Sequence, residues 1–289
     1  MPGSDTSKYA LEDIAGTAGD IHKEVKMIEI IPEIDRIEEY AELSEQYSLG
    51  FEYNDFFNPD LLDDEAGIRE KIRRYRQLRR PEKMDTMHGA FFDIVPFSWD
   101  SGISRHSLYR MQQSVEIAAK LGCRAVIFHA GLNPEFARGE RYYRNWLETM
   151  DSVARKLAAQ SDVEVYYENV QETSPAELAE LAERLRDEKH FGICIDIAHM
   201  MLTKGASLEE WIHRLAPYIR HFHLNDTYLK TDDHLALGCG SIDWKEVFSR
   251  IRQYGLCDRS MLLEVNGLQK ISTSLEYLKR QEIEKASEL

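Results

Sequence analysis

Eight short apolar segments recur along the chain from Lys26 onward, and stretches with helical periodicity separate them. The segments read KMIEII, LGFEYN, DTMHGAF, RAVIFHA, EVYYEN, GICIDI, IRHFHL and SMLLEV. Between them apolar residues return every three or four positions, as in SLYRMQQSVEIAAKLG. Strands that alternate with helices form parallel sheets, and strands covered on both faces are continuously apolar. Eight such units over about 260 residues predict one α/β domain, a single (β/α)8 TIM barrel.

An open, doubly wound sheet is the competing architecture for this alternation. Its usual dinucleotide-binding signature, GxGxxG after the first strand, does not occur here, which favours the barrel. Residues 1–25 are polar, small and weakly periodic, and we interpret them as a short N-terminal extension of a barrel that spans residues 26–289. One late helix has clear limits, because Asp243 can cap its start and Gly255 can end it.

Residues that can bind a metal ion stand at or just after the ends of the apolar segments. In a (β/α)8 barrel the reacting groups lie at the carboxyl ends of the strands, so these side chains should meet on one rim. Six end a predicted strand and three follow in the adjoining loops: His88, His129, Glu168, Asp196, His223 and Glu264, then His199, Asp232 and His234. Such a mixture of carboxylates and imidazoles suits a divalent ion, namely Mn²⁺, Zn²⁺, Co²⁺ or Mg²⁺.

Each candidate also has an ordinary structural interpretation. Glu168 or Glu264 could pair with an arginine, although each follows an apolar run that would otherwise bury it unpaired. His199 could simply begin a helix, and residues 232–234 could be a solvated loop. His221 shares a strand face with His223 because side chains alternate with a period of two, so we expect His221 one layer deeper, as a hydrogen-bonded core residue.

Composition limits the partners. The net charge of −15 makes the average surface repel nucleic acid and anionic membranes, so nucleic acid is an unlikely partner. The four cysteines have no CxxC spacing and are expected to be reduced thiols. Neither a membrane-spanning apolar run of about 20 residues nor a signal pattern occurs in the sequence, which favours a cytoplasmic location without membrane attachment.

Four segments carry a resemblance to a known superfamily: YYENV, CIDIAHM, HFHLND followed by DDHLALGCGSIDW, and LLEV. Over about residues 26–282 the chain resembles the xylose isomerase-like barrels, which include sugar isomerases, sugar epimerases and the endonuclease IV type of abasic-site nuclease. For the sugar enzymes, the resemblance implies one metal ion held by Glu168, Asp196, His223 and Glu264. For the nucleases it implies a three-zinc cluster that also uses His88, His129, His199, Asp232 and His234. All nine residues are present, so the ligand set leaves both branches open.

The first hypothesis for function is a metal-dependent isomerase or epimerase acting on a small sugar. Glu168 and Glu264 would serve as paired acid and base beside the ion. His199, Asn169 and Asn225 would hold hydroxyl groups of the sugar. Aromatic residues that could wall the pocket are Phe56, Phe91, Phe92 and Trp99. Among the superfamily's sugar enzymes dimers and tetramers are common, so the resemblance leaves a homo-oligomer open.

The second hypothesis is a zinc-dependent phosphodiester hydrolase, such as an abasic-site endonuclease. The complete set of nine ligands supports it. The predicted loops IPEIDRIEE and NDFFNPDLLDDEAG argue against it, because both are acidic and would repel a polyanion. Only GLNPEFARGERYYR offers a basic cluster, with Arg138, Arg141 and Arg144. The acidic loops favour the sugar enzyme.

Overall fold

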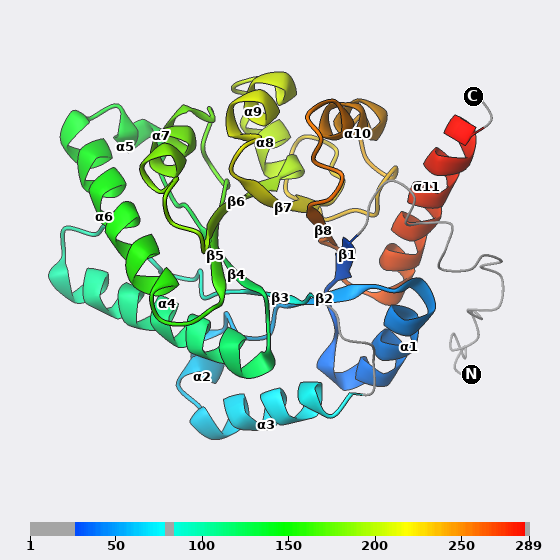
Figure 1. Ribbon diagram of the computed structural model, residues 1–289, viewed down its shortest axis with the longest axis horizontal. Helices are drawn as coiled ribbons and strands as arrows, with labels where there is room; N and C mark the ends of the chain where they lie inside the picture. Colours follow the sequence, from blue (N-terminus) through cyan, green and yellow to red (C-terminus); the bar gives the residue numbers. More distant parts are fainter. Residues whose placement is uncertain (1–26, 79–83, 287–289) are drawn as a thin grey trace, which may run out of the picture.

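The computed structural model describes residues 27–78 and 84–286, and at its centre lies a closed barrel of eight parallel strands (Figure 1). The strands are β1 (Met27–Ile30), β2 (Gly50–Tyr53), β3 (Thr86–His88), β4 (Ala125–His129), β5 (Glu164–Glu168), β6 (Phe191–Asp196), β7 (Ile219–Leu224) and β8 (Ser260–Leu263). Strands that follow one another in sequence pair with one another, and β8 pairs with β1 to close the barrel. Each predicted apolar segment forms one strand, which confirms the (β/α)8 prediction.

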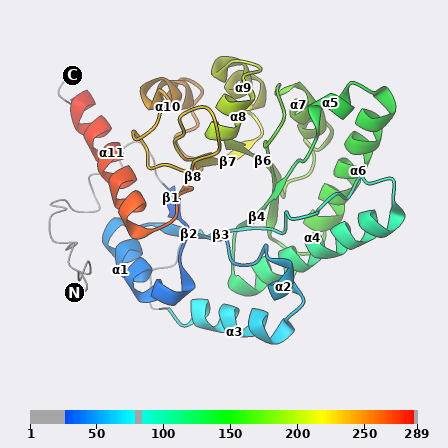
Figure 2. The ribbon, with the colours of Figure 1, turned by 180° about the vertical axis from the view of Figure 1, so that it is seen from behind.

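Helices connect the strands and form a ring around the barrel, seen from both sides in Figures 1 and 2. They are α1 (Ile37–Tyr47), α2 (Pro59–Leu62), α3 (Glu65–Arg76), α4 (Ser101–Leu121), α5 (Pro134–Ala137), α6 (Glu140–Ala158), α7 (Ala176–Arg184), α8 (Ile197–Thr203), α9 (Leu208–Leu215), α10 (Trp244–Gln253) and α11 (Leu268–Ala286), with a short 3-10 helix, η3 (Ile34–Arg36), before α1. Their apolar faces pack inward, and the large side chains of Trp146, Trp211 and Trp244 are completely buried.

The limits of α10 follow from its sequence. The Asp243 carboxylate accepts hydrogen bonds from the backbone N–H groups of Lys245 and Glu246, both at 3.1 Å. Past its end, Gly255 adopts a left-handed conformation with φ of +68°. The predicted start and end of this helix are therefore confirmed.

The inside of the barrel contains one small apolar layer and one buried polar layer. The apolar layer consists of Ala125, Ile127, Tyr166 and Cys194. The polar layer consists of Glu29, Glu52, Thr86, His221 and Ser260, each at most 1% exposed. His221 Nδ1 lies 2.5 Å from Ser260 Oγ, which confirms that His221 is a hydrogen-bonded core residue one layer below His223. Because charged groups replace apolar ones here, this layer must satisfy its own hydrogen bonds.

The predicted N-terminal extension, residues 1–25, lies outside the described residues. In the described ranges, none of the helices combines the length and apolar character that crossing a membrane requires.

Candidate metal centre

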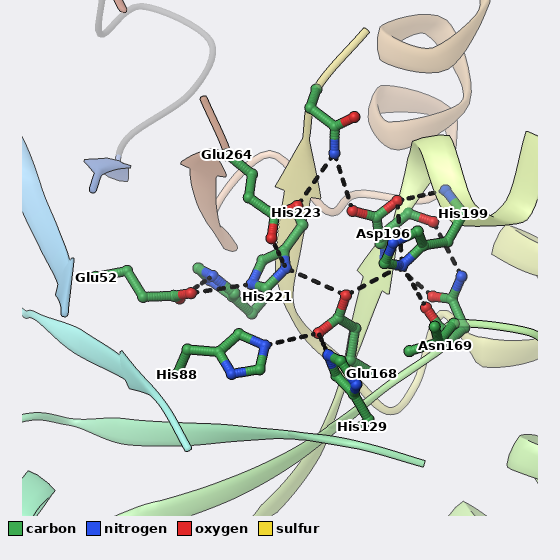
Figure 3. Close-up of polar contacts among 12 residues, drawn as sticks. Glu52, His88, His129, Glu168, Asn169, Asp196, His199, His221, His223 and Glu264 are labelled. Atoms are coloured by element: carbon green, nitrogen blue, oxygen red, sulfur yellow. Dashed lines mark hydrogen bonds and ion pairs between the residues drawn. The ribbon is translucent and has the colours of Figure 1, made fainter. Parts of the chain in front are cut away.

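The barrel brings the six strand-end candidates to one rim. His88, His129, Glu168 and Asp196 are the last residues of β3, β4, β5 and β6. His223 is the penultimate residue of β7, and Glu264 directly follows β8. Since all eight strands are parallel, these ends share one face of the barrel, and the side chains converge above its axis (Figure 3).

Glu168 lies in the middle of this cluster and is 1% exposed. Its Oε2 lies 3.4 Å from His88 Nε2 and 3.7 Å from His129 Nε2. Its Oε1 lies 3.3 Å from His199 Nδ1 and 3.4 Å from His223 Nδ1. Among the described residues, however, neither oxygen of Glu168 has a hydrogen bond of acceptable geometry. A buried carboxylate surrounded by nitrogens but not hydrogen-bonded to them is the arrangement expected of metal ligands.

His199 reaches the cluster from the first turn of α8. Asp196 caps this helix, and its Oδ1 accepts a 2.5 Å hydrogen bond from the His199 backbone N–H. That cap directs the His199 ring back over the barrel, with Nδ1 3.7 Å from Asp196 Oδ1. His199 is therefore part of the centre as well as of the helix start.

Asn225 connects two further carboxylates of the centre, those of Asp196 and Glu264. Its Nδ2 donates to Asp196 Oδ2 at 3.2 Å and to Glu264 Oε2 at 3.1 Å. Glu264 Oε1 in turn lies 3.6 Å from His223 Nδ1. Burial and the nearby carboxylates of Glu264 and Glu168 raise the pKa of Asp196 well above its usual value. Three carboxylates this close favour a bound cation between them.

Asp232 and His234 enter from the loop between β7 and α10. Asp232 Oδ2 lies 3.3 Å from His199 Nε2 and 3.0 Å from His234 Nε2. His234 Nδ1 lies 3.9 Å from Glu264 Oε2. Burial alone would lower the pKa of His199, but the Asp196 and Asp232 carboxylates hold it well above its usual value. All nine predicted ligands thus gather in one place.

The loop that carries Asp232 and His234 is organised by Asp226, a residue that has no predicted role from the sequence. The fully buried Asp226 carboxylate accepts hydrogen bonds from the backbone N–H groups of Thr227, Gly238, Gly240 and Ile242 and from Trp244 Nε1, at 2.9–3.2 Å. A Cβ atom at Gly240 would lie 2.3 Å from Asp226 Oδ1. Glycine is therefore required where this backbone passes the carboxylate.

The potential donor atoms are numerous enough to hold more than one divalent ion at the same time. In three groups the potential ligand atoms all lie within 4.8 Å of one another: His88 with His129 and Glu168, Glu168 with Asp196 and His199, and Asp196 with His223 and Glu264. Glu168 and Asp196 each belong to two of these groups, as bridging carboxylates would. Mixed imidazole and carboxylate ligands suit Zn²⁺, Mn²⁺ or Co²⁺.

A pocket of about 640 Å³ opens above the centre. Its wall includes the candidate ligands His88, His129, His199, Asp232, His234 and Glu264, together with Ile31, Pro32, Glu33, Ile34, Asp35, Asn54, Asp55, Phe57, Phe91 and Asn266. Of the residues that the structure describes, the lining includes Glu33, Asp35 and Asp55 but no lysine or arginine. The lining therefore carries carboxylates but no cationic side chain other than its histidines, and one of these carboxylates, Asp55, is paired with Lys71 at 2.8 Å.

The predicted substrate contacts divide into two groups. His199 and Asn225 lie in the centre. Asn169 lies behind it, where its side-chain amide donates to the Asp196 carbonyl at 3.0 Å and accepts from the Asp196 N–H at 2.9 Å. The structure thus gives Asn169 the role of fixing Asp196, and both ends of its amide are occupied.

The aromatic predictions need correction. Phe56 is 0% exposed and packs against Tyr75, so it has no surface to offer a substrate. Trp99 is 66% exposed, but it lines a separate hollow with Phe136 and Tyr142 rather than the pocket over the centre. Both positions follow a predicted strand, but that spacing does not show where a loop side chain points.

Phe91 does line the pocket. Its ring stacks on His129 with centroids 4.9 Å apart. Phe92 packs on Phe91 and is 51% exposed. Phe57, which was not predicted, completes this wall, with its ring centroid 4.7 Å from that of Phe91.

Comparison with known proteins places the chain in a family. The family described as xylose isomerase-like TIM barrel matches residues 44–281. A protein of Thermoplasma acidophilum named probable endonuclease 4 is 29% identical over 199 residues, which cover 64% of this chain and 67% of that protein. A Thermus thermophilus protein whose crystals were soaked with ZnCl2 is 26% identical, with a TM-score of 0.67 over 88% of this chain and 96% of that one.

A D-tagatose 3-epimerase-like protein shares the fold, with a TM-score of 0.70 and 20% identity over 91% of this chain and 98% of that one. With its closed eight-stranded barrel and the match over most of its length, the chain belongs to the xylose isomerase-like TIM barrel family.

Proposed function

We propose that this protein is a metal-dependent isomerase or epimerase that acts on a small, uncharged sugar. The observation that carries the proposal is the convergence of Glu168 and Glu264 on His223 Nδ1, at 3.4 and 3.6 Å, at the floor of an acidic pocket. A neutral polyol does not feel the negative wall that would repel a phosphate-rich substrate. The volume of about 640 Å³ accommodates a monosaccharide.

The two glutamates supply the acid and the base of this reaction. A divalent ion in the centre would polarise a substrate carbonyl and so acidify the C–H bond beside it. One glutamate removes that proton as a carboxylate, and the other returns a proton from the opposite side. Return to the same carbon inverts it and gives an epimer, whereas return to the neighbouring carbon, with transfer of the adjacent hydroxyl proton to the former carbonyl oxygen, gives an isomer.

Surrounding residues keep Glu168 ionised, which is the form that can accept a proton. Burial alone would raise the pKa of Glu168, but the His223 and His199 rings hold it well below its usual value, so it is a carboxylate at neutral pH. Asn225 fixes one oxygen of Glu264 at 3.1 Å. The rings of Phe57 and Phe91 offer an apolar surface to one face of the sugar.

Proton exchange with solvent tests the proposal directly. The protein, loaded in turn with Mn²⁺, Co²⁺ and Zn²⁺, is incubated with a panel of ketoses and aldoses in D2O, and deuterium at the carbon beside the carbonyl is followed by NMR. We expect exchange with at least one sugar, and a loss of about 100-fold or more in Glu168→Gln and in Glu264→Gln. Glu38→Gln, at an exposed position of α1, is the control. If no metal form exchanges a proton from any of the sugars, the proposal is wrong.

A second candidate is a phosphodiester hydrolase with several zinc ions. The observation that favours it is the placement of His88, His129, Asp232 and His234, which a single-ion centre does not require. The probable endonuclease 4 of Thermoplasma acidophilum is consistent with it. The absence of lysine and arginine from the described pocket lining counts against a polyanionic substrate.

Metal content and one double variant separate the two candidates. A single-ion isomerase should keep its ion and its proton exchange in Asp232→Ala combined with His234→Ala. A multi-zinc hydrolase should lose one ion per chain by elemental mass spectrometry and lose cleavage of a duplex that contains an abasic site.

A further inference from the structure

Glu52 is a fully buried carboxylate in β2, directly below the metal centre. Its Oε1 lies 3.4 Å from His223 Nε2, and its Oε2 lies 3.2 Å from His221 Nε2 (Figure 3). The other nitrogen of His223, Nδ1, faces Glu168 and Glu264. The His223 ring therefore directs one nitrogen at the metal ligands and the other at Glu52.

The hydrogen bonds below Glu52 begin at Arg124, whose guanidinium group can only donate. Arg124 Nη2 donates to Ser260 Oγ at 2.6 Å. Ser260 Oγ lies 2.5 Å from His221 Nδ1 and 3.5 Å from its other possible acceptor, the Arg220 carbonyl, and from this difference we assign its single proton to the bond with Nδ1. With Nδ1 as acceptor, the ring proton of His221 is on Nε2, which faces Glu52.

Glu52 is the acceptor at which these contacts end. Its Oε2 accepts a hydrogen bond from Thr86 Oγ1 at 2.8 Å and faces His221 Nε2. Its Oε1 lies 3.4 Å from His223 Nε2, and among the described residues neither atom has a hydrogen bond of acceptable geometry, so each is the partner available to the other. An ionised carboxylate can only accept. A proton on His223 Nε2 therefore finds an acceptor, whereas a lone pair on that nitrogen would face another lone pair.

From this geometry we propose that Glu52 is a positioning residue for the metal centre. Glu52 accepts the Nε2–H of His223 and thereby leaves the Nδ1 lone pair of His223 free for the ion. The proposal rests on the proposed metal centre and extends it by one residue. Carboxylates that orient ligand histidines in this way commonly contribute 10- to 100-fold to metal affinity, an order-of-magnitude figure.

The same residues could instead hold a separate ion in the polar layer. The potential ligand atoms of Glu29, Glu52 and His221 also lie within 4.8 Å of one another. Arg124 argues against this second ion, because its guanidinium lies 3.2 Å from Glu29 Oε1 and already supplies the positive charge of the layer. Metal stoichiometry distinguishes the two possibilities.

The test measures zinc binding and the protonated nitrogen of His223 in the full chain. Zinc affinity is determined by competition with a chelating dye, and stoichiometry by elemental analysis. Long-range ¹H–¹⁵N spectra of the zinc-loaded protein report the tautomer, with the His223 signal assigned by its loss in His223→Asn. Glu29→Gln is the matched control, since Glu29 is an equally buried carboxyl group of the same layer that bonds Thr86 and Arg124 instead of His223.

We expect His223 to be protonated at Nε2 and bound through Nδ1 in the wild-type protein. Glu52→Gln should bind the same number of zinc ions about 10- to 100-fold more weakly, while Glu29→Gln keeps the wild-type affinity. A wild-type His223 protonated at Nδ1, or an unchanged affinity in Glu52→Gln, would overturn the positioning role and leave the centre itself in place. The loss of one whole ion in Glu52→Gln would make Glu52 a ligand and also overturn it. A wild-type protein that binds no zinc would refute the centre and the positioning role together.

Discussion

Replacing Glu29 by glutamine should stabilise this protein, and the gain should grow as the pH rises. Thr86 Oγ1 lies within hydrogen-bond reach of both Glu29 Oε2 and Glu52 Oε2, but a hydroxyl has only one proton to donate. One of the two carboxyl groups must therefore carry its own proton. Burial raises the pKa of Glu29 to about 8, against the opposing effect of Arg124, so Glu29 is the protonated one.

The size of the effect follows from the difference between the folded and unfolded states. An unfolded Glu29 loses its proton near pH 4.5, whereas the folded one keeps it until about pH 8. Between these values the folded state binds more protons, so stability falls as the pH rises. From about pH 5 to about pH 7.5 this costs roughly 3 kcal/mol. Glutamine at position 29 does not titrate, and its amide can donate to Thr86 and accept from Arg124 as the protonated acid does.

Urea unfolding at several pH values, with a chelator present so that metal binding does not contribute, measures the difference between the variant and the wild-type protein. We expect the advantage of Glu29→Gln to increase by about 1 kcal/mol per pH unit through this range. Glu38→Gln, at an exposed position, should show a difference that is independent of pH. A constant difference for Glu29→Gln as well would mean that Glu29 is ionised and simply paired with Arg124, and the reasoning would be wrong.

Three further predictions concern the centre and its surroundings. Removing metal with a chelator should lower the melting temperature, because the buried carboxylates of Glu168 and Asp196 lose the cation between them. An ion present at 100 times its Kd contributes about 2.7 kcal/mol to the free energy of unfolding. Calorimetry with and without the chelator measures the shift. Phe56→Ala should cost about 3–5 kcal/mol of unfolding free energy but leave zinc affinity unchanged, and a substrate-binding role would instead appear as a raised KM at nearly normal stability. In Asp226→Ala, circular dichroism should show a folded barrel, but the loop of residues 227–242 should become sensitive to limited proteolysis. The reason is that at least five hydrogen-bond donors lose their acceptor. A loop as resistant as in the wild-type protein would contradict this prediction.

The architecture could be read from the sequence because one signal repeats eight times. Each apolar segment is short and continuous, and a stretch with helical periodicity follows it. In the folded barrel these segments form the strands and the periodic stretches form the helices. The convergence of the nine candidate ligands could be predicted for the same reason. Each stands where a strand ends or shortly afterwards, and parallel strands bring their carboxyl ends to one rim.

The residues that were missed depend on contacts between distant segments. Glu29 and Glu52 lie inside apolar strands, and a charged residue there was a signal that could have been used, but its partners Arg124 and His221 come from other strands. The role of Asp226 depends on how the loop after β7 folds back over it. The aromatic character of Phe56 and Trp99 suits a sugar pocket, but the direction of a loop side chain is decided by packing, which the sequence does not show.

Asp232 and His234 lie in the loop that Asp226 organises, so these two candidate ligands are structurally separate from those that the strands carry. Glu168, Asp196, His223 and Glu264 belong to or adjoin strands of the barrel, but Asp232 and His234 lie together in one connection, which the Asp226 carboxylate helps to organise. A few substitutions in that connection could therefore add or remove an ion-binding arm without disturbing any strand. In evolutionary terms, the ion that Asp232 and His234 would help to hold could be gained or lost by rebuilding one loop, on a barrel that stays the same.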